Sequence, residues 1–162
     1  SLIPTYGAVR TRLQESVSGA GTSSDFNSTE GTLFAEIKKE EGNTSTSLMS
    51  LLGSGTDRVS MYYFGVNQFY ADIVSSSVSI TMNCGTIDTS DYIKVAVKYK
   101  NNDSSVWING VEVATDLRAV SLVGLDEMSL KNGTDNFFGK TSQIQVFKTA
   151  LTDAELLTLT TI

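Results

Sequence analysis

Apolar and polar residues alternate along short segments through most of the chain, and turn-forming residues interrupt this alternation about every ten residues. A period of two is typical of a strand that buries one of its faces. The clearest case is 92–100, where Ile93, Val95 and Val97 face one way while Lys94 and Lys98 face the other. The pattern predicts strands at 32–38, 47–52, 58–64, 69–74, 78–82, 92–100, 127–131 and 140–148.

Residues 105–115 are predicted to form a hairpin, because Asn109-Gly110 separates two alternating runs. Asn and Gly tolerate the positive φ that a type I′ turn requires at both central positions. This turn sets three cross-strand pairs, two on the core side and one on the opposite side: Ile108–Val111, Val106–Val113 and Trp107–Glu112. The only tryptophan of the chain is therefore expected to face away from the core.

The period changes near the C-terminal end of the sequence. The run TDAE at 152–155 has the spacing of a capping box, in which Thr152 and Glu155 satisfy each other's backbone amides. Three leucines follow at 156, 157 and 159. One short helix that closes the domain is therefore predicted.

Together these elements predict an all-β fold, an antiparallel two-sheet β-sandwich with one short C-terminal helix. The alternation of strands and helices that builds a parallel sheet is absent. A chain of 162 residues suits a single domain over 1–162. Residues 117–125 are expected to cross between the sheets as a loop. Residues 1–27, rich in Ser, Gly and Thr, are either an edge strand, centred on 6–13, or a tether.

Composition excludes several classes of function. The chain has no histidine, which removes Ser-His and Cys-His catalysis and His-ligated zinc. The net charge of −6 disfavours nucleic acids and anionic membranes as partners. No apolar run approaches the length of a transmembrane helix, so membrane insertion is not expected. The single cysteine, Cys84, cannot form an internal disulfide and is predicted to be a small apolar residue on a strand.

Three segments carry a family resemblance: STEGTLFAEI at 28–37, KVAVKYKNNDSSVWINGVEVATD at 94–116 and FFGKTSQIQVFKTALTDAELLTLT at 137–160. Their amino-acid sequences and the spacing between them resemble concanavalin A-like lectin/glucanase domains of the laminin-G-like branch, over about 28–161. The first and last segments look most like the versions found in bacteriophage tail fibres and other virion surface proteins. The resemblance implies a jelly-roll sandwich, although fold alone does not fix function.

The resemblance also implies a role. We expect a non-catalytic recognition module on the surface of a virion, made in the host cytoplasm and binding a host surface glycan or receptor. Its other expected partners are virion proteins and further copies of itself, as in a trimer. A structural or oligomerisation domain without a host ligand is the alternative, and a polysaccharide-degrading enzyme is a lesser one.

Catalysis is disfavoured by the arrangement of the acidic residues. The glucanase relatives use a Glu-x-Asp-x-x-Glu strand motif, in which carboxylates on one face flank the glycosidic bond. Here Asp126 and Glu127 are adjacent and would face opposite ways, and Lys38 lies between Glu36 and Glu40. We therefore expect the domain not to be an enzyme.

Some relatives bind calcium through loop residues. The chain has acidic and amide residues in its predicted loops, at Asp88, Asp91, Asn101, Asn102, Asp103, Asp135 and Asn136. They lack a specific calcium-binding spacing, and turn chemistry accounts for them. The expectation is therefore no cofactor or metal, with calcium left open as an alternative that no motif supports.

The candidate binding surface is aromatic, because aromatic rings stack on the apolar faces of sugars. Trp107 and Glu112 lie on the outer side of the predicted hairpin, and Tyr62, Tyr70 and Asp72 lie on the non-core faces of their strands. If these strands share one sheet, the five residues form a ligand-binding patch. The alternative is that Trp107 packs under the N-terminal segment or the C-terminal helix, or at a contact between subunits.

Overall fold

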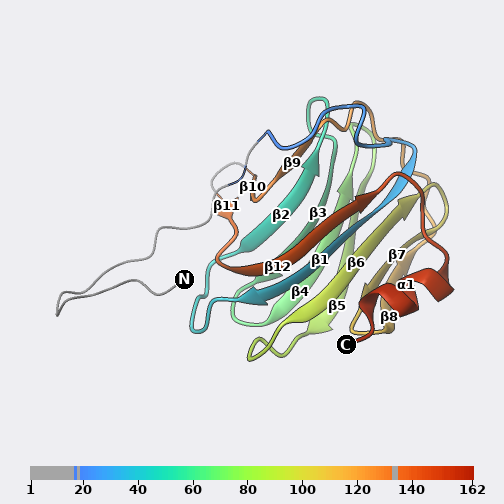
Figure 1. Cartoon of the computed structure of the whole chain (residues 1–162). Coiled ribbons are helices and arrows are strands. Elements are labelled where there is room, and N and C mark those ends of the chain that lie inside the picture. Colours follow the sequence, from blue (N-terminus) through green and yellow to red (C-terminus); the bar gives the residue numbers. More distant parts are fainter. Residues whose placement is uncertain (1–16, 18, 133–134) are drawn as a thin grey trace.

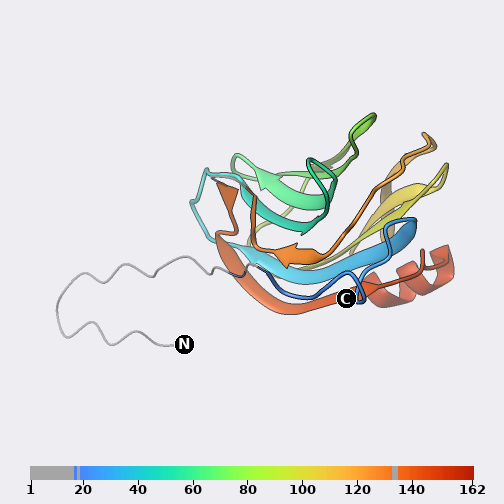
Figure 2. The ribbon, with the colours of Figure 1, turned by 90° about the horizontal axis from the view of Figure 1, so that it is seen from above.

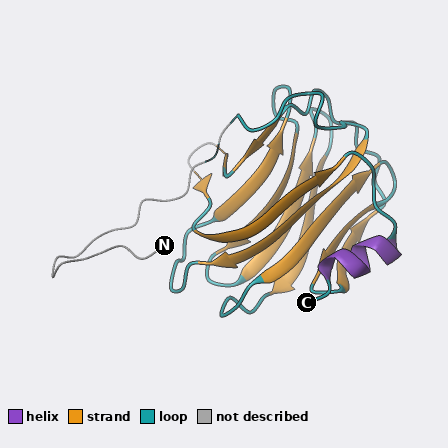
Figure 3. Ribbon diagram, viewed as in Figure 1, coloured by secondary structure: helices purple, strands orange, loops and turns teal. Residues whose placement is uncertain are grey.

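Two β-sheets packed face to face form the body of the computed structural model, which describes residues 17, 19–132 and 135–162 (Figures 1 and 2). The described chain has a single α-helix, shown in Figure 3 beside the strands. The all-β sandwich with one C-terminal helix is thereby confirmed. The strand expected around 6–13 lies outside the described residues.

The five-stranded sheet has the order β12-β1-β6-β7-β8. All its neighbouring strands pair antiparallel. Its strands are β1 (Glu30–Lys39), β6 (Ile93–Lys100), β7 (Ser104–Ile108), β8 (Val111–Asp116) and β12 (Gly139–Phe147).

The seven-stranded sheet has the order β10-β11-β2-β3-β4-β5, with β9 pairing with β2 off this path. Its pairs are antiparallel except for one parallel contact between β11 and β2. Its strands are β2 (Ser47–Leu52), β3 (Arg58–Phe64), β4 (Gln68–Val74), β5 (Ser79–Thr86), β9 (Glu127–Ser129), β10 (Lys131–Asn132) and β11 (Asp135–Asn136).

The main core lies between the two sheets and is built by the residues that alternate inward on each strand. The expected inward residues of β6, such as Val95 and Val97, are fully buried there and belong to the same cluster as Met61 and Phe69 of the other sheet. Cys84 is also part of this core and forms no disulfide. Burial raises the pKa of the Cys84 thiol to about 12, as expected for an apolar position.

The chain crosses from one sheet to the other between β8 and β9, and this segment, 117–126, contains no strand, as expected. Val120, Leu122 and Leu125 bury their side chains in the core along the way. The described residues 19–29, which precede β1, pack on the same sandwich. Ala20 pairs with Met128, and Phe26 lies in the core.

The β7–β8 turn has the predicted conformation, with φ of 50° at Asn109 and 80° at Gly110. The Asn109 side-chain oxygen accepts a hydrogen bond from the Lys94 amide at 2.9 Å, which fastens the turn to β6. The predicted pairs Ile108–Val111 and Trp107–Glu112 are confirmed, and the pair Val106–Val113 is wrong. A bulge between Val106 and Trp107 pairs Val106 with Ala114 in place of Val113, because the bulged strand inserts one extra residue.

Helix α1 (Asp153–Thr160) begins with the predicted capping box. The Thr152 amide donates to Glu155 Oε2 at 2.8 Å, and the Glu155 amide donates to Thr152 Oγ1 at 3.4 Å. The helix lies against the outer side of the five-stranded sheet, away from the other sheet (Figure 2). There Leu156 forms a second small core with three residues of that sheet: Phe34, Ala96 and Trp107.

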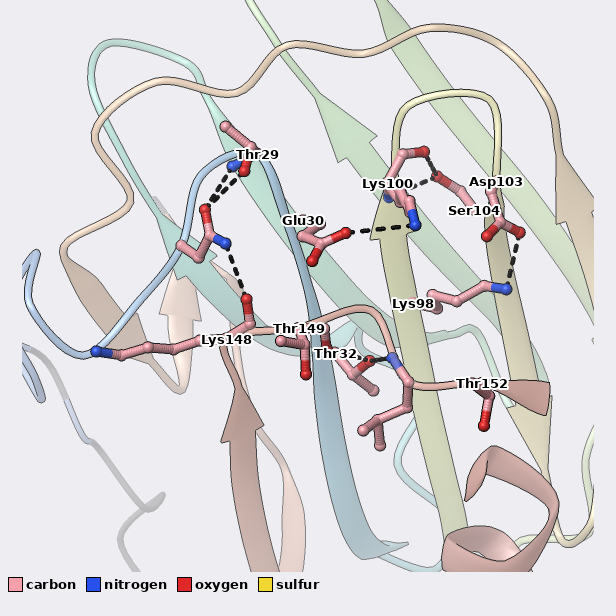
Figure 4. Close-up of polar contacts among 12 residues, drawn as sticks. Thr29, Glu30, Thr32, Lys98, Lys100, Asp103, Ser104, Lys148, Thr149 and Thr152 are labelled. Atoms are coloured by element: carbon pink, nitrogen blue, oxygen red, sulfur yellow. Dashed lines mark hydrogen bonds and ion pairs between the residues drawn. The ribbon is translucent and has the colours of Figure 1, made fainter. Parts of the chain in front are cut away.

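A buried lysine ties the start of α1 to the sheet. Lys98 Nζ lies 2.8 Å from Asp103 Oδ1 (Figure 4) and 3.3 Å from Asp153 Oδ1. The Lys98 side chain is almost fully buried. Burial lowers the pKa of Lys98, but the two carboxylates outweigh this effect, so its pKa lies above the ordinary value. Nearby, Glu30 pairs with Lys100, and Thr32 accepts from the Leu151 amide (Figure 4).

Replacing Leu156 by Ala is expected to destabilise the domain by about 2–4 kcal/mol, because it leaves a cavity between α1 and the sheet. Urea unfolding followed by far-UV circular dichroism measures this loss. The matched control is Leu157→Ala, which removes an exposed leucine of the same helix and should cost less than about 1 kcal/mol. Equal losses in the two variants would contradict the packing described here.

Replacing Lys98 by Met keeps the buried stem but removes both ion pairs, and is expected to cost about 1–3 kcal/mol at pH 7. Because the folded-state pKa of Lys98 is raised, its stabilising contribution is complete below the unfolded value of 10.5 and is lost as the pH rises through the folded value. The difference in unfolding free energy between the parent and the variant should therefore stay constant from about pH 7 to 9 and shrink above about pH 10.5. A difference in unfolding free energy that stays the same above about pH 10.5 would contradict the ion-pair account.

Candidate functional site

The five residues predicted to form one binding patch lie on opposite sides of the sandwich. Trp107 and Glu112 are partners across β7 and β8 in the five-stranded sheet. Tyr62, Tyr70 and Asp72 lie in β3 and β4 of the seven-stranded sheet. The single patch required all five residues to lie in one sheet, and they lie in two.

Trp107 is covered by the helix, as in the packing alternative. Its side chain is 9% exposed and packs in the cluster that contains Leu156, while Glu112 beside it is exposed. The indole Nε1 is buried and has no hydrogen-bond partner among the described residues. A sugar stacks on an open ring face, and Trp107 does not present one.

The outer face of the seven-stranded sheet carries a cluster of three aromatic rings. The rings of Tyr62 and Tyr70, which are cross-strand partners, stack with centroids 5.6 Å apart and planes 18° apart. The Phe64 ring meets Tyr70 edge-on, at 6.1 Å and 89°. Tyr62, Phe64, Tyr70 and Asp72 are called the aromatic face below.

Phe64 is the residue of this face that the sequence interpretation missed. Its side chain is 56% exposed, which is the largest exposed aromatic surface among the described residues. The alternation of β3 placed it on the same side as Tyr62, and that signal could have identified it. The sequence did not show whether the neighbouring turn would cover it.

Polar side chains surround the aromatic face. Asn83 of β5 is exposed and pairs with Tyr70 across the strands. Gln68, the cross-strand partner of Phe64, donates from Nε2 to Thr86 Oγ1 at 3.1 Å. Aromatic rings beside amides, hydroxyls and a carboxylate are the combination that holds a sugar by stacking and by hydrogen bonds.

The Tyr62 hydroxyl donates to Asp72 Oδ1 at 3.3 Å. Burial raises the pKa of Tyr62, and the negative charge and hydrogen bond of Asp72 raise it further. Tyr62 therefore stays protonated, and it holds one oxygen of Asp72. The second oxygen of that carboxylate remains an acceptor for a ligand hydroxyl.

A buried lysine anchors the turn that carries Phe64. Lys39, at the end of β1, is almost fully buried, and its Nζ donates to the Gly65 carbonyl. The same atom lies 5.6 Å from the centroid of the Tyr63 ring. Burial lowers the pKa of Lys39. These contacts fix the β3–β4 turn, and with it the position of Phe64, relative to the five-stranded sheet.

A cleft of about 670 Å³ lies at the same end of the sandwich. It is bordered by the β5–β6 loop, the β7–β8 turn and Ile162, near the C mark in Figure 1. Three carboxylates line it, those of Glu36, Asp88 and Asp91, together with one lysine, Lys94. Its volume lies within the range typical of small-molecule sites.

Asp72 of the aromatic face and Glu127 in β9 do not form a glycosidase pair. Glu127, whose Oε1 accepts from the Gly19 amide, lies outside the aromatic face. The strand order β9-β2-β3-β4 separates them by three strand spacings, about 14 Å. Glycosidase carboxylates lie roughly 5–9.5 Å apart, so this pair is too far apart for that reaction.

The described residues contain no group of three or more His, Cys, Asp or Glu side chains that could hold a metal ion. No helix among them is both long enough and apolar enough to cross a membrane.

The comparisons with known proteins rest on structure. No family model matches the sequence, and no curated protein matches it. The CBM40 of the Ruminococcus gnavus IT-sialidase, solved bound to α2,3-sialyllactose, is similar with a TM-score of 0.71 and 20% identity over 91% of this chain and 95% of that one.

Two further structures are similar. The SAP-like pentraxin of Limulus polyphemus, a native heptamer, has a TM-score of 0.69 and 15% identity over 93% of this chain and 77% of that one. Domain 4 of the arabinanase AbnA of Geobacillus stearothermophilus, solved with arabinotriose, has a TM-score of 0.65 and 18% identity over 83% of this chain and 68% of that one. These likenesses show that the chain folds as a lectin-like jelly roll, as the resemblance to concanavalin A-like domains implied.

Proposed function

We propose that this domain is a non-catalytic glycan-binding module and that the aromatic face is its binding surface. The observation that carries the proposal is the exposed Phe64 ring, set at right angles to Tyr70 and next to Asp72 and Asn83. A ring of this kind supplies stacking area, and the polar neighbours supply orientation.

The similar structures support a carbohydrate ligand. One was solved with α2,3-sialyllactose and another with arabinotriose, and both are binding domains of larger enzymes. The wide separation of Asp72 from Glu127 supports binding without hydrolysis. On the other sheet, α1 covers Trp107, so that ring does not offer a stacking surface to a glycan.

We further propose that the domain belongs to the surface of a virion, in a tail fibre or similar appendage. This location is supported by the sequences of 28–37 and 137–160, which resemble those of bacteriophage virion proteins. Its ligand there is a host surface glycan, and several copies on one appendage make a weak single site effective.

A structural role in the appendage is the second candidate. The observation that favours it is a group of exposed apolar residues at the β7–β8 turn and the end of α1: Val111, Leu157 and Ile162. Such residues occur at contacts between copies. A concentration-dependent trimer in analytical ultracentrifugation, without glycan binding, would favour this role.

Phe64→Ala and Tyr70→Ala are each expected to weaken glycan binding about tenfold, equivalent to ~1.4 kcal/mol, because each removes stacking area. The domain is first screened on an array of bacterial surface oligosaccharides together with sialyllactose and arabinotriose. Titration calorimetry with the strongest ligand then compares the variants.

The matched control is Val123→Ala, which truncates an exposed apolar residue in the segment between β8 and β9 and should leave affinity unchanged. Thermal unfolding verifies that each variant is folded. Undiminished affinity in both aromatic variants would place the site elsewhere. Failure to bind any glycan, even when the domain is displayed in many copies on a bead, would contradict the proposed function.

A further inference from the structure

Asn83 and Asp72 are diagonal neighbours on β5 and β4, beside the Tyr70 ring. Tyr70 pairs with Asn83 across the strands, and Asp72 follows Tyr70 by two residues on the same side of the sheet. Asn83 is exposed and Asp72 is half-buried. Diagonal neighbours of this kind have Cα atoms about 7–8 Å apart, so their side chains reach one small ligand together.

A β-bulge orients the amide group of Asn83. The β4–β5 register shifts between Gln68 and Tyr70, because β5 inserts one extra residue there. Gly85 lies in this bulge with a φ of 80°, and its amide donates to Asn83 Oδ1 at 2.9 Å. Since the oxygen accepts this bond, the Nδ2 group and its two N–H donors are left for a ligand.

Asp72 presents the complementary group. Its Oδ1 accepts from the Tyr62 hydroxyl at 3.3 Å, and its Oδ2 is left as an acceptor. None of the ion pairs among the described residues involves Asp72. The aromatic face therefore has one hydrogen-bond acceptor, on Asp72, next to one donor group, on Asn83.

An acceptor next to a donor suits two adjacent hydroxyl groups of one sugar ring. A hydroxyl both donates and accepts, so one hydroxyl donates to Asp72 Oδ2 while the oxygen of the next accepts from Asn83 Nδ2. The bond to the carboxylate is the stronger of the two, because its acceptor is charged. A sugar in which either hydroxyl is removed or substituted loses one of these bonds.

The carboxylate also disfavours acidic sugars. A sugar carboxylate beside Asp72 would bring two like charges together, in a chain whose net charge is −6. Arg58, the cation of β3 on this side of the sheet, lies beyond Asp72 as seen from Tyr70. Its Nη1 donates to the Thr56 carbonyl at 3.4 Å. A sugar that contacts Tyr70 and Asn83 therefore meets the negative charge first.

We propose that the aromatic face selects neutral sugars with two free adjacent hydroxyl groups, and that Asp72 and Asn83 bind those hydroxyls. The proposal rests on the glycan-binding function proposed above and names its substrate class. Phe64 and Tyr70 supply the stacking area, whereas Asp72 and Asn83 decide which sugar binds.

The first test concerns charge and uses the strongest neutral ligand of the glycan array. The same glycan with its primary hydroxyls oxidised to carboxylates is the matched probe, because its ring hydroxyls are unchanged. Titration calorimetry at about 50 mM salt should show about tenfold weaker binding of the oxidised form, a difference that shrinks as salt rises. Asp72→Asn should reduce this difference about threefold or more, because it removes the charge.

The second test locates the two hydroxyls with derivatives of the same ligand that each lack one hydroxyl. Two adjacent positions should each lose about tenfold in affinity, and the others should lose less. Asn83→Ala should abolish the sensitivity to one of these hydroxyls, and Asp72→Ala the sensitivity to its neighbour, because each variant removes the partner of that hydroxyl. Thermal unfolding verifies that each variant is folded.

Two control variants lie outside the aromatic face. Asp126→Asn removes one exposed charge and should leave the preference for the neutral form intact. Asn101→Ala removes an exposed asparagine whose Oδ1 likewise accepts from a backbone amide, that of Val120, and should leave the response to every hydroxyl unchanged. Phe64→Ala should weaken the neutral and oxidised forms equally, because it removes stacking area from both.

The outcomes separate the two proposals. An array on which only acidic glycans bind, or an oxidised form that binds as tightly as the neutral one, overturns the selection of neutral sugars while the glycan-binding function stands. A hydroxyl response that persists in both Asn83→Ala and Asp72→Ala overturns the role of these two residues. The parent ligand series alone decides against the pair of adjacent hydroxyls if no two adjacent positions matter. Absence of binding to every glycan overturns both proposals.

Discussion

The packing of α1 against one sheet makes the two outer faces of this sandwich different. Leu156 packs against Trp107, Phe34 and Ala96. The ion pairs of Lys98 connect the first turn of the helix to the same sheet. Burial of these side chains supplies stability, in the way that an amphipathic helix usually docks. The consequence is that this face is used for folding, and the exposed aromatic and polar side chains of the seven-stranded sheet remain for a ligand.

The end of the sandwich that carries Phe64 is built from segments far apart in the sequence. The end of β1, the β3–β4 turn, the β5–β6 loop and the β7–β8 turn meet there, joined by contacts such as Lys39 to Gly65 and Asn109 to Lys94. A buried ammonium is costly unless it is hydrogen-bonded, and the Gly65 carbonyl accepts from that of Lys39. This contact fixes the turn that positions the most exposed aromatic ring of the face.

Strand positions and the helix cap were predictable because they depend on local patterns. The alternation in 92–100, the turn at Asn109-Gly110 and the capping box at Thr152 each specify a backbone conformation within a few residues. The assignment of Trp107 was not predictable in this way. Alternation shows that it leaves the main core but does not show that a helix far along the sequence will cover it, since Trp107 and Leu156 are brought together only by tertiary packing.

The contrast between local patterns and tertiary packing also explains the other differences between the predictions and the structure. Whether Tyr62 and Trp107 share a sheet depends on strand order, which a single sequence does not reveal. The bulge that pairs Val106 with Ala114 depends on contacts beyond the turn. The cleft depends on the meeting of β1, the β5–β6 loop, the β7–β8 turn and Ile162, so Glu36 lies far in the sequence from Asp88 and Asp91.

The central claim is that glycans bind the aromatic face and not the tryptophan side. Chemical-shift mapping by NMR, with an array-selected glycan added to isotope-labelled domain, tests it most directly. The claim predicts large shifts for the ring signals of Phe64 and Tyr70 and for the amides around Asp72, and an unmoved indole Nε1–H signal of Trp107. Shifts centred on the Trp107 indole and the neighbouring residues of α1, with Phe64 and Tyr70 unmoved, would contradict it.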